Sequence, residues 1–236
     1  MNTEQNLSSA CHPNNGWTSV YLIRHGQTEG NAKHLFIGST DLPLDDVGQR
    51  QALALGKRLA KTHFDAVISS PLRRARQTAN RISHFSGTAL SIHPGFTEID
   101  FGELEGKTIE WFETHHRDLA SIHATPASNG VAWPRGESRS DFNDRVIRSF
   151  SDTLCKYNRH TIAVVCHGGV IGSILSHIQG GLPNDWVKFA VQNCSITHLE
   201  IDHTQTRFHM LNDYHHLNEV QKNLFALNPI AYQSGK

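Results

Sequence analysis

The chain has 236 residues, of which 38% are hydrophobic, enough for a sizeable core and compatible with a single large domain. Lysine plus arginine and aspartate plus glutamate both number 22, so no net field attracts nucleic acid or an anionic membrane. No apolar run approaches the length of a membrane span. We therefore expect a small-molecule partner and neither nucleic acid nor a membrane, while a homodimer is compatible with the sequence.

The N-terminal segment differs in composition from the rest. Residues 1–16 are polar and lack the cationic start and apolar stretch of a secretory signal, so we expect a flexible tail followed by a single domain over 17–236. The cysteines form no CxxC pair, which fits a reducing, cytoplasmic location. They are Cys11, Cys155, Cys166 and Cys194.

The first predicted strand, at residues 20–23, is a short apolar run that ends in Arg24 and His25. A loop over 31–46 follows, and its Asp45 and Asp46 are candidates for the N-cap of a helix over about 47–61. Ligands bind just beyond the carboxyl ends of parallel strands, so Arg24 and His25 occupy a position suited to chemistry.

A second strand is predicted at 64–69 and a third at 90–93. Between them Ser70 and Pro71 indicate the start of a helix, because proline is tolerated in the first turn. This helix begins with the arginines Arg73, Arg74 and Arg76. The loop over 96–107 contains the carboxylates Glu98, Asp100 and Glu103.

Residues 103–135 resemble a lid or insertion more than a core element. After them, Phe142, Val146, Phe150 and Leu154 recur at four-residue steps and predict a long helix that covers a sheet. The apolar run 161–166 predicts a central parallel strand ending at His167, with a further helix behind it. Residues 194–201 and 207–211 predict an antiparallel pair at one sheet edge.

This alternation predicts a three-layer α/β/α sandwich with a mostly parallel central sheet and one antiparallel edge. Its strand ends would bring four polar sites together: Arg24 with His25, the Arg74 region, the Glu98 loop and His167. Guanidinium groups, imidazoles and a helix N-terminus suit a doubly charged tetrahedral oxyanion, so a phosphoryl group is the natural ligand. An imidazole can act as nucleophile and a carboxyl group can transfer a proton.

Four motifs in this order resemble the histidine phosphatase, or phosphoglycerate mutase-like, superfamily. They are LIRHGQT at 22–28 with Asn31, SSPLRRARQTA at 69–79, EIDFG at 98–102 and VCHGG at 165–169. The resemblance covers about residues 18–220 and implies a phosphoglycerate mutase-like fold. An Arg-His-Gly triplet alone is common by chance, whereas four motifs in order and spacing are specific.

The resemblance implies a phosphohistidine mechanism without metal or other cofactor. His25 would be the nucleophile and Glu98 the proton donor, while Arg24, Arg74 and His167 would hold the phosphoryl oxygens. Arg74, rather than Arg73, aligns with the family arginine. The resemblance also implies substrate contacts by the following residues: Asn31, Gly168, Thr28, Ile37 and Gly38.

Structural explanations compete with some of these roles. A lone histidine at a strand end is often hydrogen-bonded to backbone, and Arg73 and Arg76 fit a solvated helix face. Asp100 and Glu103 compete with Glu98 for the acid role. The 17 histidines show no HExxH-like spacing, so we expect no built-in metal site.

The family contains phosphatases and mutases, and this sequence departs from the mutase pattern. Mutases usually carry tryptophan where this chain has Gly30, and a hydroxyl residue and tryptophan around the glycine of Ile37-Gly38-Ser39. We therefore expect a phosphomonoesterase acting on a small phosphorylated metabolite, similar to the broad-specificity or cobalamin-pathway phosphatases. The alternatives are a cofactor-dependent phosphoglycerate mutase and a non-catalytic protein that binds a phosphorylated ligand.

Overall fold

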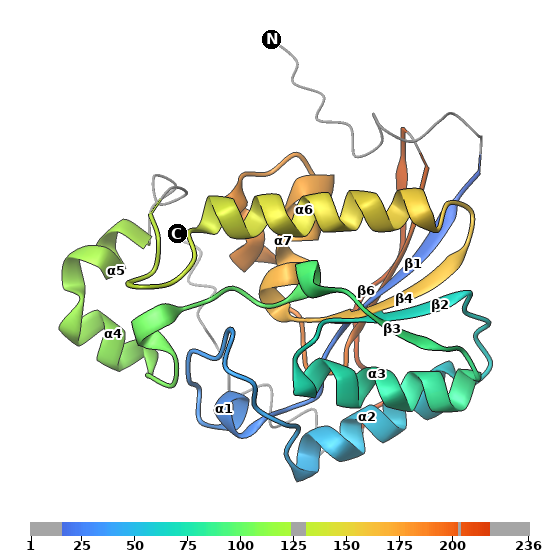
Figure 1. The fold of residues 1–236 in the computed structure, drawn as a ribbon, viewed down its shortest axis with the longest axis horizontal. Coiled ribbons are helices and arrows are strands. Elements are labelled where there is room, and N and C mark those ends of the chain that lie inside the picture. The colour runs from blue at the N-terminus through green and yellow to red at the C-terminus, as the bar shows by residue number, and fades with distance from the viewer. Residues whose placement is uncertain (1–15, 124–130, 203, 218–236) are drawn as a thin grey trace.

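The computed structural model describes residues 16–123, 131–202 and 204–217. A six-stranded sheet lies at its centre, in the strand order β3-β2-β4-β1-β5-β6 (Figure 1). The strands are β1 Thr18–Arg24, β2 Ala66–Ser69, β3 Leu90–Ile92, β4 Thr161–Cys166, β5 Ile196–Ile201 and β6 Thr206–Asp213. The first four strands are mutually parallel, whereas β5 is antiparallel to both neighbours, β1 and β6.

Helices cover both faces of this sheet. The α-helices are α1 Glu29–Ala32, α2 Asp46–Leu59, α3 Arg73–Ser86, α4 Ile109–His115, α5 Arg117–His123, α6 Arg139–Lys156 and α7 Gly168–Ile178. Short 3₁₀ helices span Pro94–Phe96, Gly102–Leu104 and Pro183–Phe189. Helices α2 and α3 lie on one face and α6 and α7 on the other, which confirms the predicted three-layer α/β/α fold (Figure 1).

Strand β4 is buried on both faces, as its unbroken apolar sequence predicts. Ile162, Val164 and Cys166 pack in the core under α6 and α7, whereas Ala163 and Val165 pack under α2 and α3. Successive side chains of a strand point to opposite faces, so one strand contributes to two cores. The site at its carboxyl end is therefore held by both layers.

The helix starts on either side of β2 differ from one another in how they are capped. Asp45 caps α2 by accepting a hydrogen bond from the Gly48 N–H (2.8 Å), as predicted. Helix α3 begins at Arg73, two residues later than the Ser-Pro pair predicts. The Ser70 hydroxyl instead accepts a hydrogen bond from the Leu72 N–H (3.3 Å), and Leu72 becomes an extended N-cap.

Cys194 also differs from its predicted place, because it precedes β5 in a turn with φ of 56°. Cys166 and Cys194 are buried free thiols. Among the described helices, none is long and apolar enough to cross a membrane.

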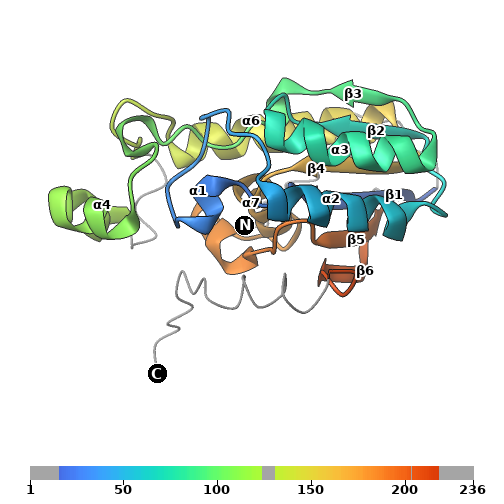
Figure 2. The same cartoon turned by 90° about the horizontal axis from the view of Figure 1, so that it is seen from below.

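The segment predicted to be a lid contains α4 and α5, which project beyond the end of the sheet (Figure 1; Figure 2 shows α4 from below). Aromatic packing ties this segment to the loop after α1. The ring centroid of Phe36 lies 5.0 Å from that of Phe101 and 5.8 Å from those of Phe112 and Trp133. Residues 124–130 of the predicted lid, like residues 1–15 of the predicted tail, lie outside the described residues. The single-domain division and the lid role stay predictions.

Candidate active site

The parallel pairing of β1 with β4 brings two histidines together. Arg24 pairs with Cys166 in register, and the next residues along the strands are His25 and His167. The His25 N–H donates to the Cys166 carbonyl (3.0 Å), which extends the ladder by one bond. The two imidazole centroids lie 5.1 Å apart with their planes inclined at 59°. Sheet register, rather than sequence proximity, therefore builds this pair.

Nδ1 of His25 lies 2.7 Å from the Gly26 carbonyl oxygen, and the residue is 4% exposed. A carbonyl can only accept a hydrogen bond, so Nδ1 carries the proton, and the unprotonated Nε2 accepts a hydrogen bond from Arg74 Nε. Burial, followed by the charges of Arg74 and Arg24, holds the pKa of His25 well below its usual value of 6.5. His25 is therefore a neutral imidazole whose Nε2 can attack an electrophile.

Arg74 lies between the two imidazoles. Its Nε is 3.3 Å from Nε2 of His25 and 3.3 Å from Nδ1 of His167, and the side chain is 1% exposed. Its Nη1 and Nη2 donate to the carbonyls of Thr40 (2.7 Å) and Gly38 (2.6 Å). Burial lowers the pKa of Arg74 to about 10, so the guanidinium stays charged at neutral pH.

The other arginines at this helix start behave as predicted for a solvated face. Arg73 and Arg76 are exposed, whereas Arg74 points into the site. The loop carboxylate Asp41 accepts a hydrogen bond from the Arg73 N–H (2.6 Å) and ties the loop to the first turn of α3. The sequence-based choice of Arg74 over Arg73 therefore agrees with its burial.

His167 is fully buried and is the N-cap residue of α7. An arginine nitrogen can only donate, so Nδ1 of His167 accepts from Arg74 and its Nε2 donates to the Ser70 hydroxyl (2.7 Å). Burial, and then the charge of Arg74, holds the pKa of His167 well below 6.5. Gly168 begins α7 against Arg24: a Cβ on Gly168 would lie 3.6 Å from Arg24 Nε.

Arg24 contains a buried donor that the fold does not use. Its Nη1 donates to the Val191 carbonyl (2.6 Å), whereas its buried Nε has no hydrogen-bond partner among the described residues. An unpartnered buried N–H costs about 1–3 kcal/mol. A negatively charged ligand oxygen at this position would satisfy it.

Glu98 is 9% exposed, and backbone amides hold its carboxylate. Oε1 accepts from the Ile99 N–H (3.0 Å) and Oε2 from the Gly169 N–H (2.9 Å). A Cβ on Gly169 would collide with this carboxylate, so a larger residue there would displace the Glu98 side chain. Burial raises the pKa of Glu98 above 4.5, against the opposing effects of these amides and of Arg74 and Arg24. A raised pKa suits a proton donor.

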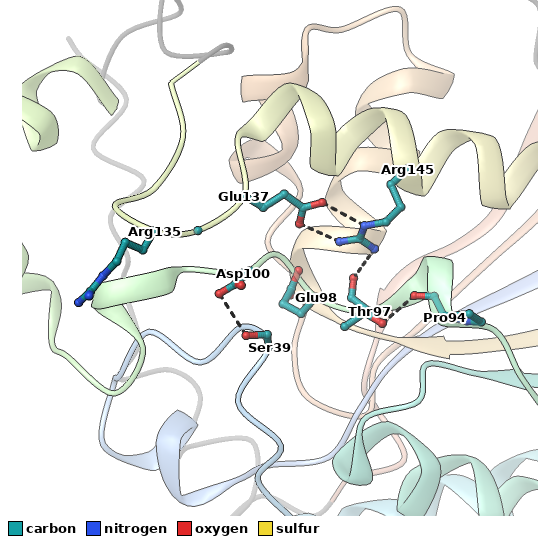
Figure 3. Close-up of a pocket in the computed structure, with 9 residues that line it drawn as sticks. Ser39, Pro94, Thr97, Glu98, Asp100, Arg135, Glu137 and Arg145 are labelled. Carbon is teal, nitrogen blue, oxygen red and sulfur yellow. Dashed lines mark hydrogen bonds and ion pairs between the residues drawn. The ribbon is translucent and has the colours of Figure 1, made fainter.

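Glu98 faces a pocket of about 460 Å³ (Figure 3). Its lining residues are Ser39, Pro94, Thr97, Glu98, Asp100, Arg135, Gly136, Glu137 and Arg145. The competing carboxylates are placed differently: Asp100 accepts from Ser39 Oγ (3.1 Å), and Glu103 forms a surface ion pair with Arg135 (2.6 Å). Among these three acids, Glu98 is the one bonded to α7 next to His167.

The predicted contacts Asn31 and Thr28 form a capping box at α1. Asn31 Oδ1 accepts from the Thr28 N–H and hydroxyl (both 3.1 Å) and from Asn193 Nδ2 (3.3 Å). With its oxygen occupied in this way, the amide nitrogen of Asn31 remains available as a donor. Thr28 is buried and is the N-cap residue of α1, so its hydroxyl bonds within that helix start, where it accepts from the Asn31 N–H.

The predicted contacts Ile37 and Gly38 lie in the loop that holds Arg74. Ile37 packs against Gly30 so closely that a Cβ there would lie 2.8 Å from Ile37 Cδ1. Gly38 donates its N–H to the Glu105 carboxylate (3.1 Å), which also accepts from Ser39 N–H and from Thr40. Glu105 thus shapes the loop whose carbonyls hold Arg74.

Sequence reasoning missed four residues that support the site. The Thr78 hydroxyl accepts from the Gly26 N–H (3.0 Å), and Asn193 Nδ2 donates to the His25 carbonyl (2.9 Å). The other two are Ser70 and Glu105, described above. Ser70 and Thr78 lie inside the motif at 69–79, and Glu105 lies three residues after the motif at 98–102, so a spatial reading of those regions could have found them. Asn193 carries no such signal.

Among the described residues, no group of three or more histidine, cysteine, aspartate or glutamate side chains could hold a metal ion. The arrangement instead offers a neutral imidazole, two buried guanidinium groups and a buried carboxyl group at the carboxyl edge of a mostly parallel sheet. These groups can bind a phosphoryl dianion and supply a nucleophile and a proton.

The chain matches a known protein family over most of its length. The model for the histidine phosphatase superfamily (branch 1) matches residues 20–214, and the chain belongs to this family. A relative from Hydrogenobacter thermophilus, named "Putative phosphoserine phosphatase 2", is 32% identical over 203 residues, 85% of this chain and 98% of that protein.

A relative from Erwinia tasmaniensis, named "Probable phosphoglycerate mutase GpmB", is 30% identical over 187 residues, 79% of this chain and 86% of that protein. Among solved structures, a mutant phosphoserine phosphatase from Entamoeba histolytica in complex with phosphoserine superposes with a TM-score of 0.74 at 27% identity. That match covers 85% of this chain and 100% of the other.

Proposed function

We propose that this protein is a phosphomonoesterase that hydrolyses a small phosphorylated metabolite through a phosphohistidine on His25. In class it is a metal-independent, histidine acid phosphatase-type phosphoric monoester hydrolase. The observation that carries the proposal is the tautomer of the His25 imidazole and the groups that surround it. Its Nδ1 proton is fixed on the Gly26 carbonyl and its Nε2 faces Arg74 Nε at 3.3 Å, beside a second buried imidazole.

Substrate binding follows from the available donors. The phosphoryl oxygens accept from the unpartnered Arg24 Nε, from the Arg74 guanidinium and from the amide nitrogen of Asn31. His167 and the start of α7 at Gly168 lie at the same strand ends. These fixed positive groups stabilise the charge on the equatorial oxygens of the transferring phosphoryl group.

The reaction has two steps. In the first, His25 Nε2 forms a bond to phosphorus while the phosphorus–oxygen bond to the leaving group breaks, and Glu98 gives its proton to the departing oxygen. In the second, water attacks the phosphohistidine and gives a proton to the Glu98 carboxylate, which releases phosphate and restores His25. General acid–base help of this kind contributes about 10²–10⁴-fold to the rate.

The experiment measures hydrolysis of p-nitrophenyl phosphate in EDTA by the parent protein and by His25→Ala. We expect EDTA-resistant turnover in the parent and a loss of at least about 10³-fold in the variant, compared on protein that is folded by circular dichroism. Equal, negligible turnover in both would refute the enzyme and favour a non-catalytic phospho-ligand-binding protein. Turnover abolished by EDTA would refute the metal-independent mechanism.

A phosphoglycerate mutase is the second candidate, favoured by the name of the Erwinia relative. The sequence argues against it, because this chain carries Gly30, with Ile37 packed closely against it, where mutases usually carry tryptophan. Assays with 3-phosphoglycerate distinguish the two. A phosphatase releases free phosphate faster than it forms 2-phosphoglycerate, and the reverse order would establish the mutase.

A further inference from the structure

Arg145 and Glu137 form a fork-to-fork ion pair beside the candidate site (Figure 3). Arg145 lies on α6, and Glu137 lies two residues before that helix. Nε of Arg145 donates to Oε1 of Glu137 (3.0 Å), and Nη2 donates to Oε2 (2.8 Å). Both side chains are less than a third exposed, and bidentate pairs of this kind fix orientation as well as charge.

The remaining guanidinium nitrogen of Arg145 holds the segment that leads into Glu98. Nη1 donates to the carbonyls of Gly95 and Thr97, both at 3.0 Å. On the other side of Glu98, the Glu137 N–H donates to the Asp100 carbonyl (2.9 Å). The Arg145–Glu137 pair therefore fixes the backbone immediately before and shortly after Glu98.

The pattern of contacts separates Arg145 from the phosphoryl-binding arginines. All three of its nitrogens donate to the protein itself, whereas Arg24 retains an unpartnered Nε. Arg145 lines the pocket but is committed to one side chain and two backbone carbonyls. Its contacts suit a role in holding Glu98 rather than in binding substrate.

We propose that Arg145, oriented by Glu137, is a positioning residue for the proton donor Glu98. The inference rests on the proposed function, in which Glu98 protonates the leaving oxygen. A general acid must lie within hydrogen-bond reach of that oxygen, and a displacement of about 1 Å can cost about 10²-fold in rate. Without Arg145, the carbonyls of Gly95 and Thr97 lose their shared donor and the Glu98 segment is free to shift.

The test compares two leaving groups. p-Nitrophenolate departs without a proton, whereas the alkoxide of glycerol 2-phosphate needs one, so only the second substrate requires the acid. The measured quantity is kcat/KM, which depends on the steps up to phosphorylation of His25 and is independent of the later hydrolysis of phosphohistidine. For Arg145→Met we expect kcat/KM to fall about 10- to 100-fold for glycerol 2-phosphate and less than about 3-fold for p-nitrophenyl phosphate.

Three further variants complete the design. Glu98→Gln removes the acid, so its losses of kcat/KM for the two substrates show the difference expected when the acid is completely absent. Arg148→Met changes an exposed arginine on the same helix, whose Nε contacts the Asp144 carbonyl, and should leave both substrates unaffected. Arg145→Lys keeps the charge but cannot make all four bonds, so it should show a smaller selective loss and serves if Arg145→Met does not fold.

The outcomes are distinguishable. Suppose that Glu98→Gln loses kcat/KM selectively for glycerol 2-phosphate. If the Arg145 variants then lose kcat/KM equally for both substrates, or lose none for either, the positioning role of Arg145 is overturned. If Glu98→Gln itself is not selective, the acid role in the proposed function fails, and this inference fails with it. Turnover of p-nitrophenyl phosphate also reports that each variant retains a folded site around His25.

Discussion

At the scale of single residues, burial shifts the pKa values of the two groups proposed to react, His25 and Glu98. His25 and Glu98 are both removed from water, and in both cases this favours the neutral form. The pKa of His25 is lowered and that of Glu98 is raised, so each moves toward the form that the proposed chemistry uses. A neutral imidazole attacks and a neutral carboxyl group donates its proton.

These pKa directions predict the pH dependence of the reaction. As pH rises through the raised pKa of Glu98, the acid ionises and kcat/KM for glycerol 2-phosphate should fall; the lowered pKa of His25 keeps the nucleophile active in mild acid. We expect Glu98→Gln to lose this descending limb. The second ionisation of the substrate affects the pH profiles of parent and variant alike. If the profile of Glu98→Gln falls with pH as that of the parent does, the fall belongs to a group other than Glu98.

Arg24 provides a second prediction at this scale. Arg24→Met removes the buried unpartnered Nε but also the donor of the Val191 carbonyl, so the two effects on stability oppose each other, while the variant loses a charged donor to phosphate. We expect inhibition by inorganic phosphate to weaken about 10- to 100-fold and the midpoint of urea unfolding to change little. The exposed Arg73→Met is the matched control. Unchanged phosphate inhibition in Arg24→Met would remove Arg24 from the site.

At the scale of elements, the strand ends were predictable and their supports were not. An apolar run ending in a polar residue is visible in the sequence, so β1, β4 and the histidines that follow them could be predicted. The supports depend on where distant backbone passes: the carbonyls of Gly38 and Thr40 meet Arg74 only because the loop folds over α3. Backbone groups are the same at every residue and carry no sequence signal.

Two errors have the same origin. The start of α3 was predicted two residues early, because a serine hydroxyl that could cap the helix instead bonds to Leu72 and His167. Asn193 was missed because its amide acts on the His25 carbonyl from 168 residues away. In both cases the tertiary contact overrides or hides the local pattern.

The loop after α1 gives a prediction at the scale of elements. Glu105 accepts hydrogen bonds from the backbone at Gly38 and Ser39 and from Thr40, so Glu105→Ala should release the carbonyls that hold Arg74. We expect kcat/KM for p-nitrophenyl phosphate to fall about 10-fold or more. Glu103→Ala, which breaks only a surface ion pair, should change it little. Equal effects would exclude the loop as a support.

At the scale of the whole molecule, one sheet lies between two hydrophobic cores. The family model matches residues 20–214, which include every strand except the first residues of β1. The names of relatives span phosphatase and mutase chemistry on this fold. The fold alone therefore does not select water over a second hydroxyl as acceptor. The cytoplasmic location, the small-metabolite partner and the homodimer stay predictions.

The core under α6 offers a stability prediction. Phe150 is fully buried in it, so Phe150→Ala should lower the free energy of unfolding by about 3–5 kcal/mol, measured by urea denaturation. Phe208→Ala, at a side chain that is 41% exposed on β6, should cost clearly less. Equal losses would mean that α6 does not close the core that carries the Arg145–Glu137 pair.

The central claim is that His25 carries the phosphoryl group during turnover. The direct measurement mixes the protein briefly with p-nitrophenyl phosphate, quenches it in alkali, where phosphohistidine survives, and locates the adduct by peptide mass spectrometry. We expect one added phosphoryl group on His25, absent from His25→Ala and accumulating in Glu98→Gln, where hydrolysis of the intermediate is slow. An adduct on His167 instead would contradict the assignment of the nucleophile.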